Sequence, residues 1–190
     1  KDADANIYQE MYADGWKSLA HKLDGEIPLG LRAVGDRLIN HIPAVKSKLS
    51  SHPRTIIHGD YRLDNCLLGV PPKSNSLVVF DWEYCARGRG TFDIATFIIE
   101  AFSPQRRRSE EVDLLREYHS ILIEKGINNY SFDECVQDYR ISVLEIFAFW
   151  IVVGGFCDFE GKRATIYLNN QIERMNAAII DHNCIDLLSI

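Results

Sequence analysis

The organisation of this chain is marked most clearly by the stretch His-Gly-Asp-Tyr-Arg-Leu-Asp-Asn at residues 58–65. It lies between two short apolar runs, Thr-Ile-Ile at 55–57 and Cys-Leu-Leu at 66–68, each of which predicts a strand. A third apolar run at 77–80 follows the turn sequence Pro-Pro-Lys-Ser-Asn-Ser at 71–76, so the second and third runs predict a β hairpin. The stretch is therefore predicted to be a tight polar loop between short strands.

Apolar residues recur at helical spacing on both sides of this β patch. Pro43 is predicted to end or kink the second helix, and residues 104–108, which include three arginines, are predicted as a solvated loop. Thr91 is a candidate cap, and Ser131 with Glu134 predicts a capping box. The predicted helices span residues 8–23, 31–42, 91–102, 109–125, 131–156 and 168–179.

The order of helices, β patch and further helices predicts one mainly helical α+β domain over residues 1–190, because the βαβ rhythm of a parallel sheet is missing. Within it, residues 1–54 are a helical lead-in, 55–93 carry the polar motifs and 94–190 form a helical subdomain. Phe149, Trp150 and Phe156 are predicted to pack in the core, the alternative being that they line a substrate pocket. The glycines at 154–155 are predicted to permit close helix packing or a break.

Composition excludes some classes of function. The formal net charge of −6 argues against a general nucleic-acid binder, which would present a basic face. The five cysteines are odd in number and form no C-x-x-C pair, which disfavours a disulfide scaffold or zinc knuckle and favours a reducing, cytoplasmic location. The longest apolar run, residues 146–157, is too short to span a bilayer, so no membrane partner is expected.

Two segments have residue types suited to phosphate chemistry. An Asp two positions after a His, with an Asn five positions later, has the spacing of a kinase catalytic loop, in which Asp60 would accept the proton of an attacking hydroxyl and Asn65 would face magnesium. Asp81 follows an apolar run, and Mg²⁺ prefers such oxygen ligands. Glu83 would lie on the same side as Asp81 if the segment is extended.

These motifs resemble the aminoglycoside phosphotransferase and choline kinase superfamily, which has Gly where protein kinases have Arg in the loop at 58–65. Asp-Trp-Glu-Tyr at 81–84 is similar to the D-x-E metal motif of choline kinases. The resemblance covers roughly residues 55–145. It implies the C-terminal lobe of a protein-kinase-like fold, with ATP as phosphate donor and Mg²⁺ as cofactor.

The resemblance also implies roles for single residues. Asp60 would be the catalytic base, while Asn65 and Asp81 would hold Mg²⁺, with Glu83 as a candidate further ligand. Arg62 occupies the position of a kinase lysine that touches the transferred phosphate; the alternative is a surface salt bridge.

Two further residues would support the loop. His58 would brace it. Asp93 resembles the helix-start aspartate that hydrogen-bonds the catalytic-loop backbone. The alternative for the whole group is that these carboxylates and amides are satisfied turn residues, which Asp and Asn commonly are.

The resemblance leaves one half of a kinase unaccounted for. No glycine-rich loop, Walker A motif or strand lysine lies before residue 55, so the N-terminal lobe is expected to be absent from this sequence. The expected partner is that lobe in cis, or a second copy associating through its docking face. We therefore expect exposed apolar surface near Tyr61, Leu67 and Phe80.

The predicted function is ATP- and Mg-dependent phosphotransfer to a hydroxyl of a small molecule, impaired in this chain alone. One alternative is a non-catalytic, pseudokinase-like binding domain. The other is a metal-dependent phosphohydrolase that uses Asp60, Asp81 and Glu83 with a water nucleophile. The sequence does not choose the acceptor, because acidic residues that suit an aminoglycoside and aromatic residues that suit choline are both plentiful.

Overall fold

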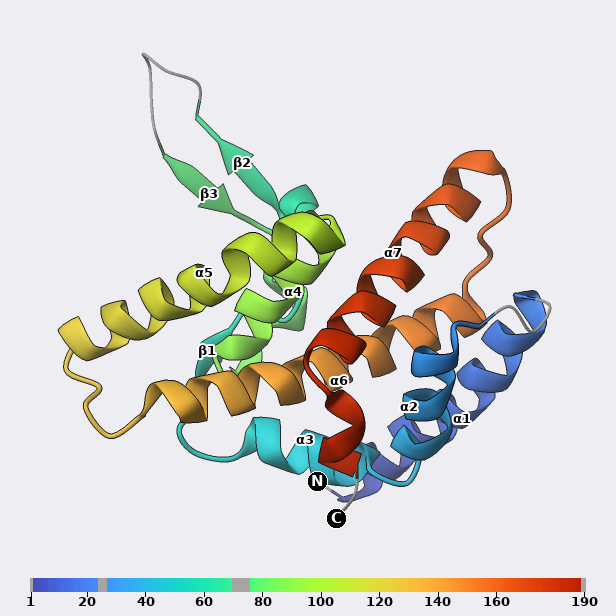
Figure 1. Cartoon of the computed structure of the whole chain (residues 1–190), viewed down its shortest axis with the longest axis horizontal. Helices are drawn as coiled ribbons and strands as arrows, with labels where there is room; N and C mark the ends of the chain where they lie inside the picture. The colour runs from blue at the N-terminus through green and yellow to red at the C-terminus, as the bar shows by residue number, and fades with distance from the viewer. Residues whose placement is uncertain (1, 24–26, 70–75, 189–190) are drawn as a thin grey trace.

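The computed structural model describes residues 2–23, 27–69 and 76–188. Helices dominate, and two small antiparallel sheets lie beside them (Figure 1). The predicted mainly helical α+β composition is confirmed. The helices are α1 (Asp2–Lys22), α2 (Leu29–Leu38), α3 (Ile42–Ser50), α4 (Thr91–Ala101), α5 (Pro104–Glu124), α6 (Phe132–Phe156) and α7 (Lys162–Asp181), with single 3-10 turns at Leu63–Asn65, Trp82–Tyr84 and Cys184–Leu188.

Both sheets have two strands and together frame the polar loop. β2 (Cys66–Leu68) pairs with β3 (Leu77–Val79) as the predicted hairpin, whose turn residues 70–75 lie outside the described residues. β1 (Thr55–Ile57) pairs with β4 (Ala86–Gly88), a strand that the sequence did not predict. This second pairing brings residues on either side of the two motifs together.

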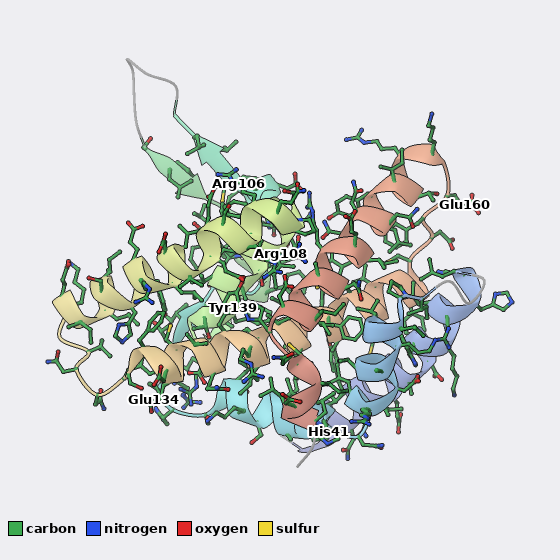
Figure 2. All side chains as sticks on the ribbon, viewed as in Figure 1. His41, Arg106, Arg108, Glu134, Tyr139 and Glu160 are labelled. Atoms are coloured by element: carbon green, nitrogen blue, oxygen red, sulfur yellow. The ribbon has the colours of Figure 1, made fainter. Side chains whose placement is uncertain are left out.

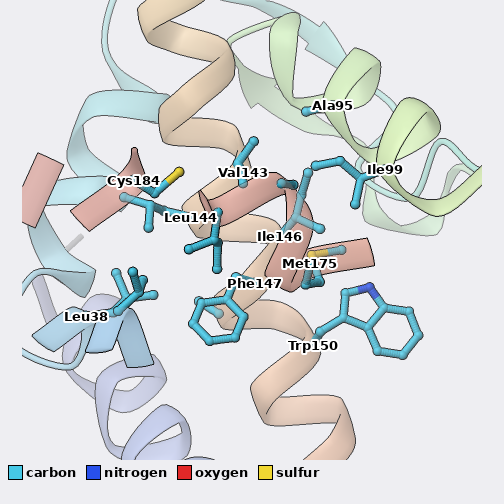
Figure 3. Packing of buried hydrophobic residues seen from close by; sticks show 14 of the residues in the cluster. Leu38, Ala95, Ile99, Val143, Leu144, Ile146, Phe147, Trp150, Met175 and Cys184 are labelled. Carbon is cyan, nitrogen blue, oxygen red and sulfur yellow. The ribbon is translucent and has the colours of Figure 1, made fainter. Parts of the chain in front are cut away.

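Helix α6 forms the centre of the molecule. The side chains drawn in Figure 3 converge on it from α2, α4 and α7. It is the one described helix long and apolar enough to cross a membrane, and two thirds of its most apolar window is buried against the rest of the protein. Burial on most sides explains why α6 is apolar around much of its circumference. Its buried residues include Val143, Leu144, Ile146, Phe147 and Ile151.

Glycines let α1 approach α6 closely, as predicted for residues 154–155. A Cβ atom on Gly155 would lie 2.4 Å from the Cα atom of Gly15, so no larger residue fits without movement. Lys22 Nζ donates hydrogen bonds to the carbonyl oxygens of Gly154 (3.2 Å), Gly155 (3.0 Å) and Cys157 (2.8 Å). The ammonium group thus satisfies carbonyls that the end of α6 leaves free.

Several helix boundaries differ from the prediction: α1 and α7 begin earlier than expected, and α3 is a separate helix that the sequence did not predict. Pro43 lies in the first turn of α3 rather than at the end of α2, because a proline lacks only an N–H that the first turn does not use. Pro104 likewise starts α5, and Ser103 Oγ caps it by accepting from Arg106 N at 3.3 Å. Thr91 is the first residue of α4 and is buried, with Gly90 at the cap position.

Residues 104–108 are therefore helical, and the predicted solvated loop is wrong. Arg107 is fully buried, donates to both oxygens of Glu111 at 2.7 Å and pairs with Asp181. Figure 2 shows Arg106 and Arg108 at the start of α5, and Arg108 Nε reaches Asp181 Oδ2 at 2.6 Å. These ion pairs join α5 to the end of α7. The capping box of Ser131 and Glu134 is present at the start of α6.

Candidate active site

The polar loop turns at Gly59, which has a φ of 86°. Most L-residues avoid this region of conformational space. A Cβ atom there would also lie 2.4 Å from the carbonyl oxygen of Tyr84, so the loop packs directly on the segment that carries the second motif. Gly59 thus allows the two motifs to meet.

His58 connects the two motifs through its ring. It is 2% exposed, and its Nε2 lies 2.8 Å from the carbonyl oxygen of Phe80. A carbonyl only accepts, so Nε2 carries the proton and Nδ1 is free to accept from Asp60 N at 3.2 Å. The ring is tilted against Trp82 at a centroid distance of 4.6 Å. These contacts are those of the bracing residue that the resemblance implies.

Asn65 orients Asp60. Its buried side-chain nitrogen donates to the backbone oxygen of Asp60 and to Asp60 Oδ2, both at 2.9 Å. Its own backbone oxygen accepts from Phe80 N at 3.1 Å, next to Asp81 in the chain. Because the side-chain nitrogen is hydrogen-bonded to Asp60, only the side-chain amide oxygen of Asn65 remains available to bind a cation.

Asp81 has a left-handed backbone, with φ 66° and ψ 57°. Aspartate tolerates this conformation better than most residues, and such strain is commonly found at functional sites. The next three residues form a 3-10 turn, so the segment is not extended and the predicted reason for placing Glu83 beside Asp81 is wrong. Both side chains nonetheless line one cavity, because the turn brings Glu83 back to the same opening.

Asp93 holds the loop from the first turn of α4. Its Oδ2 accepts from His58 N at 2.7 Å and its Oδ1 accepts from Gly59 N at 3.0 Å, which are the contacts that the sequence led us to expect. The carboxylate is partly buried. Burial raises its pKa, and the two backbone N–H groups lower it in part.

The predicted groups open onto a cavity of about 570 Å³, a volume within the usual range for small-molecule sites. Asp60, Asp81 and Glu83 all line it, whereas Asn65 stands behind Asp60 and is not part of the wall. The remaining wall comes from the polar loop, β1, the turn after Asp81, β4 with the junction that follows it, α3, α4 and α6. Its members are Lys46, Leu49, Ser50, Ile57, Gly59, Arg62, Tyr84, Ala86, Arg87, Gly88, Arg89, Phe92, Glu100, Glu145, Phe149, Trp150 and Val153.

Arg62 lies between carboxylates at the cavity wall. Its Nε is 3.5 Å from Asp60 Oδ2, its Nη2 is 3.6 Å from Asp64 Oδ2, and its Nη1 donates to Tyr167 Oη at 3.4 Å. Both interpretations of this residue fit the structure, since it makes local ion pairs and also faces the space in front of Asp60.

Glu100 is a residue of the wall that the sequence did not single out. Trp150 Nε1 donates to Glu100 Oε1 at 3.1 Å, and both line the cavity. Phe149 lines it too, as the alternative for these aromatic residues allowed, and the prediction that Phe149 and Phe156 pack in the core is wrong because both are exposed. Burial raises the pKa of Glu100 to about 7, although the hydrogen bond from Trp150 and the charge of Arg62 oppose the shift. Glu100 lies seven residues after Asp93 on α4, two turns along the same face, and this spacing was the available signal.

The site offers few protein groups that could bind a metal ion. Among the residues that the structure describes, no three His, Cys, Asp or Glu side chains are grouped to hold a metal ion. Asn65, Asp81 and Glu83 therefore remain the candidate protein ligands.

Comparison with known proteins identifies the relationship. The model of the phosphotransferase enzyme family, APH, matches residues 2–129. The chain belongs to this family. No curated protein and no solved structure gives a match. The family match includes α1, α2 and α3, so the relationship extends further towards the N-terminus than the motifs alone indicated, and it ends before α6.

Proposed function

We propose that this member of the phosphotransferase family transfers a phosphoryl group from ATP to a hydroxyl of a small molecule, with Asp60 as the base. One observation carries the proposal. The Asn65 side chain fixes both the backbone oxygen and the carboxylate of Asp60 at 2.9 Å, on a cavity that Asp81 and Glu83 also line. A base and candidate metal ligands thus open onto the same space, as phosphotransfer requires.

Asp60 would take the proton of the acceptor hydroxyl as the oxygen attacks. Positioned proton transfer of this kind contributes roughly 10²–10⁴ in rate. Asn65 restricts rotation of the carboxylate, and Asp93 and His58 fix the backbone on which it stands. Arg62 would place a guanidinium beside the incoming phosphate, in the space that it now shares with Asp60.

The site fits Mg²⁺ and ATP by the chemistry of its donors. Asp81 is exposed, so its carboxylate is accessible to a ligand. Its oxygens, those of Glu83 and the amide oxygen of Asn65 are the hard ligands that Mg²⁺ prefers. When bound, Mg-ATP would supply the transferred group and neutralise charge on the phosphates.

We propose that an N-terminal lobe in cis, or a second copy of this chain, completes the nucleotide site. The exposed fractions of Leu67 (60%), Phe80 (40%) and Trp82 (50%) support a covering partner, because such apolar side chains are seldom gathered on a free surface. Tyr61 does not join them, since its ring stacks on Phe97 at 5.3 Å.

The experiment is a phosphoryl-transfer assay against a panel of small alcohols, with calorimetric titration of Mg-ATP. We expect weak nucleotide binding by the 190-residue chain and transfer by a form that includes the covering lobe. Nucleotide binding without product in every form would favour a pseudokinase-like domain. Phosphate release without any acceptor would favour a phosphohydrolase, which the few grouped ligands make the weaker alternative.

A further inference from the structure

Arg89 is a buried arginine at the junction between β4 and α4. It is 6% exposed and contributes to the wall of the cavity. Both Nη atoms are hydrogen-bonded to other parts of the protein, whereas Nε has no hydrogen-bond partner among the described residues. Its Nη1 donates to Asp138 Oδ2 at 2.8 Å, and its Nη2 donates to Ser51 Oγ at 3.1 Å and to the carbonyl oxygen of His52 at 2.7 Å. Burying a guanidinium is energetically unfavourable unless it is paired in this way. We therefore expect Arg89 to have a structural or functional role.

The junction supports the catalytic loop from both sides. Before Arg89, β4 pairs with β1, and Ile57, the last residue of β1, directly precedes His58. After it, α4 begins, and Asp93 in its first turn holds the amides of His58 and Gly59. Movement of residue 89 would therefore reach the loop through a strand and through a helix.

The partners of Arg89 belong to helices α3 and α6 and to the segment that follows α3. Asp138 is buried on α6, the central helix, and also accepts from Tyr130 Oη at 2.9 Å. Arg89 N donates to the carbonyl oxygen of Leu49 in α3 at 3.0 Å. The junction is thus fixed to α3, to the segment after it and to α6.

We propose that Arg89 is a positioning residue for the reaction: it holds the junction of β4 and α4 against α3 and α6 and thereby sets the place of Asp60 in the cavity. This inference rests on the proposed function. It predicts that replacing Arg89 lowers kcat more than it changes KM, because both of its Nη atoms are committed to protein partners and a displacement of about 1 Å can reduce the rate roughly 100-fold.

Arg89→Ala and Arg89→Lys test the inference, with amide hydrogen exchange as the main readout. In Arg89→Ala, exchange of the His58 and Gly59 amides should accelerate about tenfold more than exchange of the core amides of Val143 and Ile146, which report the loss of global stability that follows from leaving Asp138 buried without its partner. Arg89→Lys should give a smaller effect, since a lysine keeps the charge beside Asp138 but cannot reach all three partners. If Arg89→Ala does not fold, amide exchange of the loop and of the core is compared in Arg89→Lys instead.

Arg140 provides the matched control. It also ties elements together, donating from Nε to the carbonyl oxygen of His182 at 2.8 Å and from Nη2 to that of Asn183 at 3.0 Å. Arg140→Ala should leave exchange at His58 and Gly59 unchanged. The inference is overturned if Arg89→Ala leaves these two amides unaltered, accelerates all amides equally, or matches Arg140→Ala.

The kinetic arm separates this inference from the proposed function. In an active form of the enzyme, Arg89→Ala should reduce kcat with little change in KM, and added guanidinium should restore part of the rate. A loss expressed mainly in KM would count against positioning. If no form transfers phosphate, the proposed function fails, and the exchange measurement still decides whether Arg89 holds the loop.

Discussion

At the scale of single residues, the loop depends on Gly59. A side chain at this position would have to adopt a φ of 86° and would meet the carbonyl oxygen of Tyr84. Gly126 has a similar φ of 90°, but nothing lies within 4 Å of the place where its Cβ would be. Comparing substitutions at the two positions therefore separates the effect of backbone strain from the effect of a steric clash.

We predict that Gly126→Ala lowers the free energy of unfolding by about 1 kcal/mol, the strain of a left-handed residue. Gly59→Ala should lower it further and abolish phosphotransfer, because the loop has to move away from Tyr84. Urea denaturation and the transfer assay measure both effects. Equal behaviour of the two variants would show that the contact with Tyr84 does not constrain the loop.

Glu100 gives a prediction about pH. Its folded-state pKa is about 7, above the ordinary 4.5, so its contribution to stability is fully present below pH 4.5 and is lost as the pH rises through 7. Glu100→Gln keeps an acceptor for Trp150 and removes the ionisation. The variant should gain stability relative to the parent protein between pH 5 and pH 8.

Urea denaturation at the two pH values tests this, with the exposed Glu117→Gln as control. A difference between the Glu100→Gln and parent proteins that does not change with pH would mean that Glu100 ionises as freely as a surface carboxylate.

At the scale of elements, the start of α5 is fixed to the end of α7 by Arg107. Burial alone would raise the pKa of Glu111, but the hydrogen bond and charge of His182, together with those of Arg107, lower it. A carboxyl group with a lowered pKa stabilises the fold above its unfolded pKa, and that contribution is lost as the pH falls below it.

We predict that Arg107→Met destabilises the protein by about 3–5 kcal/mol, because it leaves Glu111 buried without its main partner. Glu111→Gln should make the loss of stability below pH 4.5 shallower, whereas the neighbouring, more exposed Glu110→Gln should not. Acid titration followed by circular dichroism measures the slopes. Identical slopes in the two glutamine variants would contradict the role of this ion pair.

Elements with strong local signals could be predicted from the sequence. The capping box at Ser131 and the antiparallel pairing of residues 66–68 with 77–79 depend on neighbours in the chain, and both are found. Ser103 followed by Pro104 is also a local start signal for a helix, and it decides the structure of residues 104–108 despite their three arginines. The strand at 86–88 has no pattern of its own, since only its pairing with distant β1 makes it a strand.

The same distinction applies to the site. The contacts of Asp93 with the loop follow from motif spacing, which fixes the backbone on both sides. Glu100 and Trp150 meet only because α4 packs against α6, and Arg89 meets Asp138 for the same reason. Such pairs lie about 50 residues apart, and a single sequence contains no signal of their proximity.

At the scale of the whole molecule, the hairpin presents exposed apolar side chains. Leu67 and Val78 are opposite each other in the register, and both are largely exposed. We predict that the chain self-associates through this face, and that Leu67→Glu reduces the association without lowering thermal stability. Sedimentation velocity measures it, with Leu29→Glu on α2 as an exposed control. Monomeric behaviour of the parent chain at high concentration would contradict the prediction.

The most direct test of the proposed reaction is a comparison of Asp60→Asn with Asp81→Asn in an active form of the enzyme. Asp60→Asn should reduce the rate of phosphoryl transfer by roughly 10²–10⁴ and leave the Kd for Mg-ATP unchanged, because Asp60 acts on the acceptor proton. Asp81→Asn should weaken Mg-ATP binding, because it removes a charged ligand. Transfer at the parental rate by Asp60→Asn, or an equal loss of Mg-ATP binding in both variants, would contradict Asp60 as the base.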